Sequence, residues 1–373
     1  MAIKQLHVAG YRSLRELRLE LTPLNVITGP NGSGKTNLYQ AILLLAKTAL
    51  GGFARAIGEE GGMASVFWAG ARRSRSVGSA RSSPVRLRIA IKTAGFSYEF
   101  CCGLPQQTRE TQTAFKLDPE IKYEQVSTDL SSKHVTLFER SSSGTWIRDV
   151  NGRRASYSGT LGSNEGVLSQ LQEPHLYPEL FRLRQEITGW RFYHQFDTTR
   201  ESALRLPQIG VRTPFLAHDG SDLAAALQTI IEDGNSDELR EALSRAFRGA
   251  NLNIETVSGR FSILLSIPGI SRPLGVSELS DGTLRYLCLI AALMSPRKPP
   301  LLAFNEPETS LHSDLLDGLA RMIVEASKYS QVWITTHSAQ LARLIEQHSS
   351  FRSVVLDLVD GETRLVAHKS HED

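Results

Sequence analysis

Cysteine is scarce in this sequence, because the 373 residues include only Cys101, Cys102 and Cys288. No pair of them has the spacing typical of a metal site, and the first two are adjacent in an apparent strand. This pattern argues against a metal centre built on cysteine. We interpret the three side chains as reduced thiols and expect a cytoplasmic protein without disulfides.

A strong charge of either sign is also absent. The chain has 42 Lys and Arg residues against 39 Asp and Glu residues, which gives a formal net charge of +3. The global basic field that would by itself indicate nucleic-acid binding is therefore missing.

Long hydrophobic runs are missing as well. No uncharged apolar stretch approaches the roughly 18 residues that would indicate a membrane-spanning helix. Residues 1–21 alternate apolar and polar side chains, so they lack the apolar core of a signal peptide. We therefore expect a soluble protein that reaches a membrane only through a partner. The sequence also has no internal repeat and no heptad run long enough for a coiled coil.

The sequence has the composition of an ordinary globular protein, with 41% hydrophobic and 22% charged residues. Apolar spacing predicts two short strands on either side of residues 11–13 and a buried strand at residues 24–28. Short strands dominate residues 86–150, and helical spacing dominates residues 163–250. The last third alternates between buried strands and amphipathic helices and closes with a hairpin that turns at Asp360. This order of elements predicts an α/β protein.

The most specific motif lies between the strand at 24–28 and a helix that begins near Lys35. It reads G-x-x-x-x-G-K-T from Gly29 to Thr36. Glycines let successive N–H groups turn toward a phosphate, and the N-terminal end of the following helix adds partial positive charge. In such loops the lysine bridges the β- and γ-phosphates, and the threonine hydroxyl binds Mg²⁺. The predicted nucleotide-binding residues are Asn31, Gly32, Ser33, Gly34, Lys35, Thr36 and Asn37.

Three further stretches lie toward the C-terminus. The first, SDGT at residues 280–283, opens a helix and forms a second candidate anion site. The second, LLAFNEPE, is an apolar strand that ends in Asn305 and Glu306, at the edge where sheet proteins bind ligands. The third is a buried strand that ends at His337. Each stretch alone is equally typical of a structural cap, acid or histidine, so the informative feature is their order.

Taken in that order, the motifs resemble those of the ABC-type ATPase heads of the SMC and RecF group. LSDGT resembles the ABC signature, LLAFNEPE resembles Walker B, and TTHS resembles the switch-histidine loop. The N-terminal stretch LHVAGYRSLRELRLEL is similar to the hairpin of RecF-like proteins, which carries an Arg-Ser pair. The pattern is most similar to that of compact predicted ATPases of this group, which lack long coiled coils.

The resemblance implies an α/β P-loop NTPase fold of the ABC/SMC-head type. A central mixed sheet would be flanked by helices, with an antiparallel β subdomain and a helical insertion. Residues 1–373 would form a single head. Within it we expect an N-terminal lobe at 1–160, a mainly helical insertion at 161–250 and a C-terminal lobe at 251–373.

The resemblance also implies a mechanism, because heads of this group form dimers around two ATP molecules. Ser280 and Gly282 would contact the γ-phosphate of the ATP held by the partner copy. Glu306 would act as general base or position the attacking water, and His337 would hold the γ-phosphate and that water. Lys35 completes the predicted catalytic set.

One position departs from the pattern of the group. The residue before Glu306 is normally an acid that holds Mg²⁺ through water, and here it is Asn305. An amide can accept a hydrogen bond from metal-bound water, but it brings no charge to the dication. We therefore expect Thr36 and Asn305 to hold Mg²⁺ weakly and ATP hydrolysis to be slow. Loss of a positioned acid–base group costs about 10²–10⁴-fold in rate.

Two features of the group have no firm position in this sequence. Arg12, from the N-terminal hairpin, would reach the phosphates of the nucleotide, but a surface arginine on a strand is an equal alternative. The glutamine that usually contacts the metal has four candidates, Gln106, Gln107, Gln112 and Gln125, and none has a recognisable context.

DNA is a candidate partner by analogy with the group. Two arginine clusters could neutralise its phosphates, whereas basic surface loops that only aid solubility are the alternative. The first cluster comprises Arg72, Arg73, Arg75, Arg81, Arg86 and Arg88. The second comprises Arg182, Arg184, Arg191, Arg200 and Arg205, near aromatic residues that we interpret as packing residues, namely Trp190, Phe192 and Tyr193.

Three functions therefore compete. The first is an ATPase that dimerises and serves DNA repair or defence against foreign DNA, with a separate effector or nuclease, since little chain follows His337. The second is an ATP-gated dimeric scaffold with negligible hydrolysis. The third is the ATPase subunit of a membrane transporter, which the long separation between Thr36 and Ser280 argues against.

Overall fold

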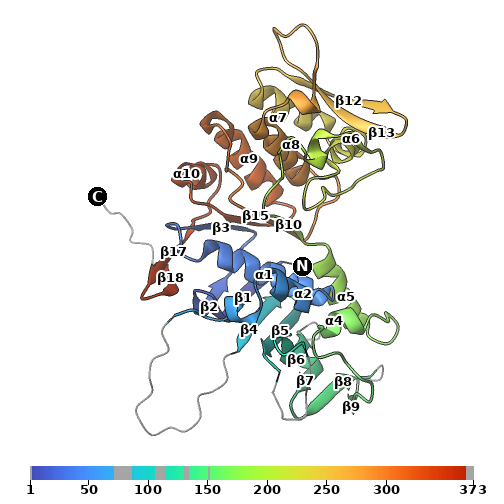
Figure 1. Cartoon of the computed structure of the whole chain (residues 1–373), viewed down its shortest axis with the longest axis vertical. Helices are drawn as coiled ribbons and strands as arrows, with labels where there is room; N and C mark the ends of the chain where they lie inside the picture. The colour runs from blue at the N-terminus through green and yellow to red at the C-terminus, as the bar shows by residue number, and fades with distance from the viewer. Residues whose placement is uncertain (1, 71–85, 106–113, 130–133, 150–151, 367–373) are drawn as a thin grey trace. The chain divides into compact units, whose positions relative to one another are not determined.

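The computed structural model describes residues 2–70, 86–105, 114–129, 134–149 and 152–366. The chain forms two compact units (Figure 1). Unit 1 comprises Met1–Thr22, Gly29–Trp190 and Val355–Asp373, and unit 2 comprises Pro23–Thr28 and Arg191–Val354. The predicted division into lobes at residues 160 and 250 stays a prediction.

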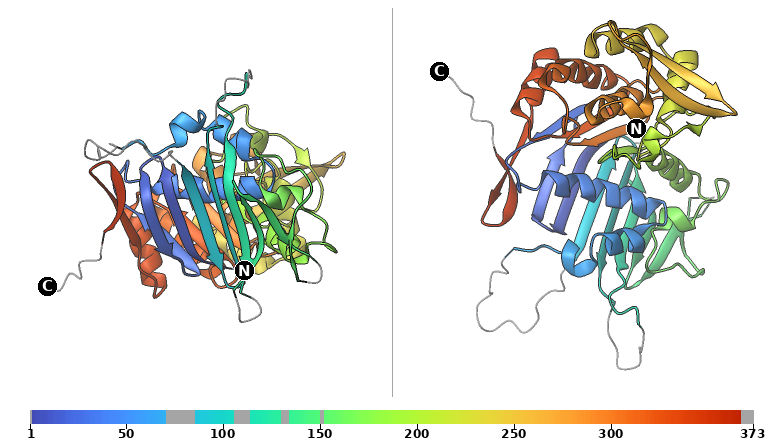
Figure 2. Two further views of the ribbon diagram at one scale, coloured as in Figure 1. Left: turned by 90° about the horizontal axis from the view of Figure 1, so that it is seen from below. Right: turned by 45° about the horizontal axis from the view of Figure 1, so that its top comes forward.

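Unit 1 is built on an eight-stranded antiparallel sheet in the order β2-β1-β4-β5-β6-β7-β8-β9 (Figure 2). Its strands are β1 (Ile3–Tyr11), β2 (Leu14–Glu20), β4 (Leu87–Thr93), β5 (Phe96–Gly103), β6 (Glu120–Thr128), β7 (Val135–Ser141), β8 (Gly144–Arg148) and β9 (Arg154–Ser156). The predicted N-terminal strands and the short strands at 86–150 are therefore confirmed. Cys101 and Cys102 lie in β5, and both are free thiols.

One face of this sheet is covered by helices. In β4 the apolar side chains of Leu87, Ile89 and Ile91 are buried, whereas Arg88 and Lys92, which point to the opposite face, are exposed. This alternation gives the sheet an apolar face, across which α1 lies (Figure 2). The helices are α1 (Lys35–Ala49), α2 (Phe53–Glu59), α3 (Met63–Val66), α4 (Val167–Gln170) and α5 (Pro178–Thr188). The predicted closing hairpin consists of β17 (Val354–Val359) and β18 (Glu362–Val366), and β18 packs beside β2.

A buried ion pair stabilises the part of the sheet around β6 and β7. Glu124 in β6 is fully buried, and its Oε2 atom lies 2.6 Å from Nη2 of Arg140 in β7. The hydroxyl of Tyr98 and the backbone N–H of Val167 also donate to this carboxylate, at 2.8 and 2.9 Å. Burial raises the pKa of Glu124, and the Arg140 guanidinium acts in the opposite direction. The pair thus joins three strands to the start of α4.

Removing one member of this pair leaves the other charge buried. We therefore expect Arg140→Ala to lower the free energy of unfolding by about 3–5 kcal/mol. The control is Arg55→Ala, because Arg55 is exposed and pairs with Glu59 on the helix surface, where such pairs contribute only about 0.3–0.5 kcal/mol. Urea denaturation measures both. Equal losses in the two variants would contradict this role of the buried pair.

Unit 2 contains four parallel strands in the order β10-β15-β16-β3. They are β3 (Leu24–Thr28), β10 (Arg191–Tyr193), β15 (Leu301–Asn305) and β16 (Gln331–Thr335). The residues of β16 are all buried, as expected for a parallel strand covered on both faces. β3, β15 and β16 were predicted. β10 was not, because its three residues are too short for a periodic signal.

The helices of unit 2 include α8, which packs against α6 and α9. They are α6 (Leu223–Asp233), α7 (Ser236–Ala246), α8 (Asp281–Leu293), α9 (Leu316–Ala326) and α10 (Ala339–His348), with short 3₁₀ helices η1 (Ala203–Arg205), η2 (Val276–Glu278) and η3 (Ser313–Leu315). A small antiparallel sheet adds β11 (Gln208–Ile209), β12 (Asn251–Val257), β13 (Arg260–Ser266) and β14 (Leu274–Gly275). Every residue of α8 from Tyr286 to Leu293 is buried. This helix is therefore the centre of the core of unit 2.

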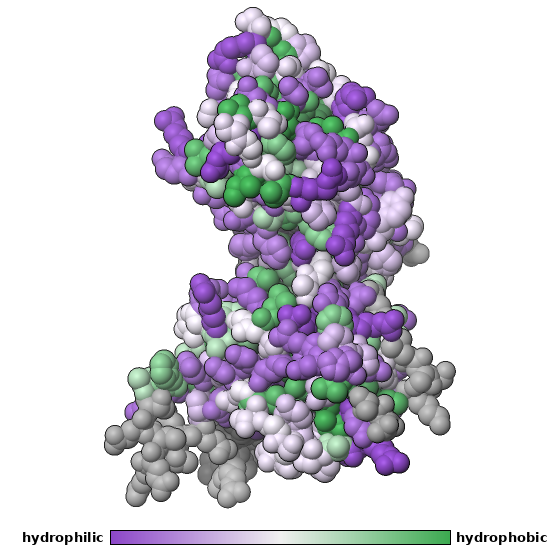
Figure 3. All heavy atoms as spheres, turned by 90° about the vertical axis from the view of Figure 1, so that its right-hand side faces the viewer, coloured by the Kyte–Doolittle hydropathy of each residue, from purple (hydrophilic) through white to green (hydrophobic). Residues whose placement is uncertain are grey.

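The surface carries no extended apolar band on the face shown in Figure 3, where hydrophilic residues dominate and hydrophobic ones lie in separated patches. Within the described ranges, none of the helices combines the length and the apolar character needed to cross a bilayer.

Candidate active site

The phosphate loop follows β3 and leads into α1. Its glycines adopt conformations that other residues rarely take, with φ of +148° at Gly29, +80° at Gly32 and +97° at Gly34. The Lys35 side chain turns back into the loop, where Nζ donates to the carbonyl oxygens of Gly29 at 2.8 Å and Pro30 at 2.9 Å. Lys35 is only 4% exposed, so its ammonium group is held inside the loop.

The N-terminal end of α1 is open to an anion. Gly34 is the N-cap, no side chain caps the helix, and its first turn has no acidic residue. The N–H groups of the first helical turn and the helix dipole therefore favour a negatively charged ligand at this end. The Ser33 hydroxyl, nearby in the loop, is buried and has no hydrogen-bond partner. An orphaned buried hydroxyl beside an uncapped helix fits the oxygens of a polyphosphate.

A chain of hydrogen bonds links the helix start that follows the phosphate loop to other parts of unit 1. Asn37 Nδ2 donates to Ser13 Oγ at 2.8 Å, and Ser13 Oγ lies 2.7 Å from Thr363 Oγ1. These contacts join the first turn of α1 to the β1–β2 turn and to β18. A Cβ atom at Gly34 would lie 2.1 Å from Thr363 Oγ1, so only glycine fits there. Neither Ser13 nor Thr363 was among the predicted residues, and no sequence signal marks Thr363.

Arg12 lies in unit 1 and pairs with an acid. Its φ is +49°, and its Nη2 atom lies 2.9 Å from Glu60 Oε2, with the side chain 31% exposed. Glu60 also accepts from the Tyr11 hydroxyl, and burial, followed by this carboxylate, raises the pKa of Tyr11. The predicted contact between Arg12 and a nucleotide stays a prediction.

The acidic end of β15 belongs to unit 2. Asn305 Oδ1 accepts a hydrogen bond from Thr335 Oγ1 at 2.7 Å, and the Glu306 N–H donates to the Thr335 carbonyl at 2.8 Å. Glu306 has a φ of +52°, a left-handed conformation that costs roughly 1–3 kcal/mol for a residue with a side chain. Such strain concentrates at functional sites, and here it turns the Glu306 carboxylate out of the strand, where it is 32% exposed.

Glu308 holds the end of β16 in place. Its Oε1 atom accepts from the Thr336 hydroxyl and from the backbone N–H groups of His337 and Ser338, the latter two at 3.2 Å. The side chain is 6% exposed, and its Oε2 atom is buried without a partner. Glu308 therefore has a structural role, because it holds the backbone that follows β16.

His337 lies between two carboxylates. Its Nδ1 atom is 3.7 Å from Glu306 Oε2 and 3.5 Å from Glu308 Oε1. The imidazole is 48% exposed, so it remains accessible to a ligand. Among the predicted residues of unit 2, Asn305, Glu306 and His337 thus gather at the carboxyl ends of β15 and β16.

A second histidine near Glu306 was not predicted. His194 follows β10 directly, and β10 pairs with β15, the strand that precedes Glu306. Burial lowers the pKa of His194, and the Glu306 carboxylate opposes this shift. Only recognition of the three-residue strand β10 could have placed this side chain at the sheet edge.

The SDGT segment forms the start of α8. Ser280 is the N-cap, and its Oγ atom accepts the N–H of Thr283 at 3.2 Å. A Cβ atom at Gly282 would lie 2.9 Å from the carbonyl oxygen of Ser310, in the loop after β15. The first turn of α8 therefore packs closely against that loop, and Ser280 stays exposed.

Three described members of the arginine clusters have internal partners. Arg88 pairs with Glu99 at 3.3 Å, and Arg191 lies over the Phe215 ring at 4.4 Å. Arg205 is nearly buried and pairs with Asp281. The aromatic residues near them are buried, which confirms their interpretation as packing residues: Trp190, Phe192 and Tyr193. Four members of the first cluster lie outside the described residues, namely Arg72, Arg73, Arg75 and Arg81.

The candidate glutamines remain unassigned. Gln106, Gln107 and Gln112 lie outside the described residues. Gln125 lies in β6, where it accepts from the Tyr123 hydroxyl at 3.0 Å and donates to Thr136 Oγ1 at 3.3 Å.

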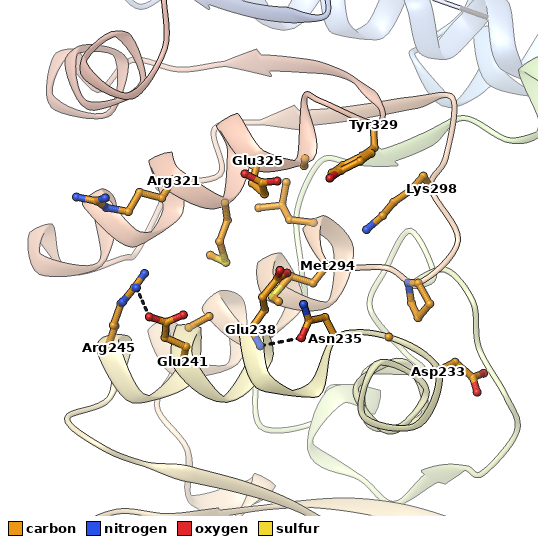
Figure 4. A pocket seen from close by; sticks show the side chains of 16 residues that line it. Asp233, Asn235, Glu238, Glu241, Arg245, Met294, Lys298, Arg321, Glu325 and Tyr329 are labelled. Atoms are coloured by element: carbon orange, nitrogen blue, oxygen red, sulfur yellow. Dashed lines mark hydrogen bonds and ion pairs between the residues drawn. The ribbon is translucent and has the colours of Figure 1, made fainter.

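A cavity of about 490 Å³ lies elsewhere in unit 2, between α7 and α9 (Figure 4). Its floor includes Met294 and Met322, and its rim carries charged residues. Several of these charges are already paired, such as Glu241 with Arg245 and Arg321 with Asp317. No residue of the candidate active site lines this cavity.

Comparison with known proteins agrees with these features. A family described as "AAA domain, putative AbiEii toxin, Type IV TA system" matches residues 24–343. The chain belongs to this family. It is also 45% identical over 47 residues to the DNA replication and repair protein RecF of Corynebacterium jeikeium strain K411, a match that spans 12% of this chain and 11% of that protein.

Solved structures of SMC heads share the fold. The SMC head bound to the C-winged helix domain of ScpA has a TM-score of 0.55 at 16% identity, covering 100% of this chain and 99% of that one. An SMC head with an extended coiled coil, bound to the C-terminal domain of ScpA from Pyrococcus furiosus, has a TM-score of 0.53 at 14% identity, with coverages of 98% and 96%. The predicted P-loop NTPase fold of the SMC-head type and the resemblance to SMC/RecF-like ABC ATPases are confirmed.

The packing around Gly34 predicts that substitution of Gly34 weakens nucleotide binding more than substitution of Gly32 does. Gly34→Ala combines a strained φ with a clash against Thr363, so binding of an ATP analogue should fall by more than about tenfold. Gly32→Ala is the matched control, because its φ is similar but no atom lies within 4 Å of the added Cβ. Isothermal titration calorimetry compares the two variants. A stronger loss for Gly32→Ala would contradict the proposed role of the Thr363 contact.

Proposed function

We propose that this protein hydrolyses ATP to ADP and phosphate, as a homodimer that encloses two ATP molecules. The observation that carries the proposal is the strained Glu306 at the end of a buried parallel strand, with its carboxylate 3.7 Å from His337 Nδ1. A carboxylate and an imidazole at this position can orient a water molecule and receive its proton, which is what phosphoryl transfer to water requires.

The phosphate loop would bind the triphosphate. The inward-turned Lys35 ammonium would exchange the Gly29 and Pro30 carbonyls for phosphate oxygens, and the open N–H groups of α1 would donate to the same oxygens. Ser33 would gain the hydrogen-bond partner that it lacks. The site thus offers charge, donors and space without a competing acid in the first helical turn.

Thr36 and Asn305 would hold Mg²⁺. Thr36 is half-buried at the start of α1, and Asn305 Oδ1 already accepts the Thr335 hydroxyl, which fixes the orientation of its amide. Both side chains offer oxygen ligands, which this ion prefers, although neither brings the negative charge of a carboxylate. When bound, the ion neutralises charge on the β- and γ-phosphates.

The second half of each pocket would come from the partner copy. Ser280 and Gly282 lie at the start of α8, an end of a long buried helix that favours a negative charge. A γ-phosphate bound at this end would link the two copies, and its loss on hydrolysis would release them. The dimer would therefore be controlled by the state of the nucleotide.

A role with DNA and a separate effector is the wider proposal. It is supported by the family of the chain and by the short match to a protein named for DNA replication and repair. A related head bound to a domain of another protein supports a partner subunit. DNA repair and defence against foreign DNA both fit an ATP-controlled dimer of this kind, and the effector or nuclease would be a separate chain.

A dimeric scaffold with negligible hydrolysis is the second candidate, and Asn305 favours it. The neutral amide brings no charge to Mg²⁺, and its Oδ1 atom is already engaged by Thr335. In that case the nucleotide would hold the dimer without being consumed at a useful rate.

Substitution of Glu306 separates hydrolysis from assembly. Glu306→Gln should lower phosphate release by about 10²–10⁴-fold and, on size-exclusion chromatography, shift to a dimer only with Mg-ATP. The matched control is Glu325→Gln, an exposed acid of α9 paired with Lys328 at 2.6 Å, which should behave as the parent does. Equal phosphate release by the parent and Glu306→Gln would favour the scaffold. A protein that stays monomeric with Mg-ATP would contradict both.

Replacing Asn305 by the acid that is usual in this group should raise the rate of ATP hydrolysis. Asn305→Asp restores a negative charge beside Mg²⁺ and can still accept the Thr335 hydroxyl. We expect half-maximal phosphate release at about tenfold less Mg²⁺, together with a higher maximal rate. A magnesium titration of ATPase activity measures both. An unchanged magnesium requirement would contradict the assignment of Asn305 to the metal.

A further inference from the structure

We propose that Arg205 is a positioning residue for the SDGT helix start and that it keeps this end of α8 able to accept a phosphate. The inference rests on the proposed function, in which Ser280 and Gly282 meet the ATP held by the partner copy. It concerns the interaction between Arg205 and Asp281, the residue between those two.

Arg205 donates hydrogen bonds to the backbone segment that precedes α8. Its side chain is 9% exposed, although it belongs to a short 3₁₀ helix far away in sequence. Nη1 donates to carbonyl oxygens of η2 and the residue after it, at 3.5 Å for Val276, 3.3 Å for Ser277 and 2.8 Å for Leu279. Nε donates to the carbonyls of Thr198 and Thr199, at 3.0 and 3.2 Å. One guanidinium group therefore holds the backbone segment that precedes Ser280 in place.

The remaining nitrogen of Arg205 holds an acid. Nη2 lies 2.7 Å from Asp281 Oδ1, and this aspartate is the first residue of α8. An acid at the first helical position is favoured by the helix dipole and can fold onto the free N–H groups. Left alone, the carboxylate would compete with an incoming phosphate for those donors and would repel it.

The ion pair with Arg205 prevents both the competition for the N–H donors and the repulsion of the phosphate. It keeps the Asp281 carboxylate directed at Arg205 and offsets its charge, although Asp281 itself is 64% exposed. The Ser280 side chain stays exposed at the helix start, where its hydroxyl accepts the Thr283 N–H. Because all three nitrogens of Arg205 donate to groups of unit 2, this arginine is better explained by the helix start than by contact with DNA.

The test measures ATP-driven dimerisation in the Glu306→Gln background by analytical ultracentrifugation. Arg205→Gln should weaken the dimer by at least about tenfold, because it removes a charged hydrogen bond and exposes an uncompensated carboxylate. Adding Asp281→Asn should recover most of that loss, since the repelling charge is gone. Arg212→Gln is the matched control, an exposed unit 2 arginine paired with Glu232 at 3.0 Å, and should leave the dimer unchanged.

Two further measurements exclude a simple loss of folding. The Arg205→Gln protein should bind ATP as tightly as its parent, because the phosphate loop is untouched. Arg205→Lys keeps the positive charge but cannot reach all the acceptors, so its dimer should be intermediate in strength.

The outcomes distinguish this inference from the proposed function. If Arg205→Gln dimerises like its parent, or if Asp281→Asn gives no recovery, the inference is overturned while the proposed function stands. If the Glu306→Gln parent itself does not dimerise with Mg-ATP, the proposed function fails, and the inference fails with it.

Discussion

The pairing of β15 with β16 is the constraint on which the candidate active site in unit 2 depends. Their register places Asn305 opposite Thr335, so that two polar segments leave the sheet at the same edge. The Thr335 hydroxyl and carbonyl then fix Asn305 and Glu306, and the buried Glu308 fixes the backbone of His337 in return. A shift of one residue in this register would separate the acid from the histidine.

In the proposed function, two helix ends would bind the phosphates. The start of α1 has no side-chain cap and no acid in its first turn, whereas the start of α8 carries a serine cap and an aspartate that is paired with Arg205. The two helix starts differ physically. No side chain caps the start of α1, whereas at the start of α8 Arg205 offsets the charge of the Asp281 carboxylate. Both leave backbone N–H groups for oxygens of a phosphate.

Much of this arrangement could be predicted from local sequence. The phosphate loop, the strand before Glu306 and the strand before His337 each carry a short motif, and their order carried the family resemblance that implied the fold. The contacts that support them could not be predicted, because they join distant residues. Thr363 reaches Gly34, and Arg205 reaches Asp281, through tertiary packing that has no local pattern. His194 was missed since β10 is too short to give a periodic signal.

The central claim is that one triphosphate is bound by two copies of this chain. A structure of the Glu306→Gln protein with ATP and Mg²⁺ tests it most directly. The account predicts a nucleotide contacted by residues 31–37 of one copy and by Ser280 and Gly282 of the other. A nucleotide whose phosphates contact residues of a single chain, with both α8 helix starts facing solvent, would contradict it.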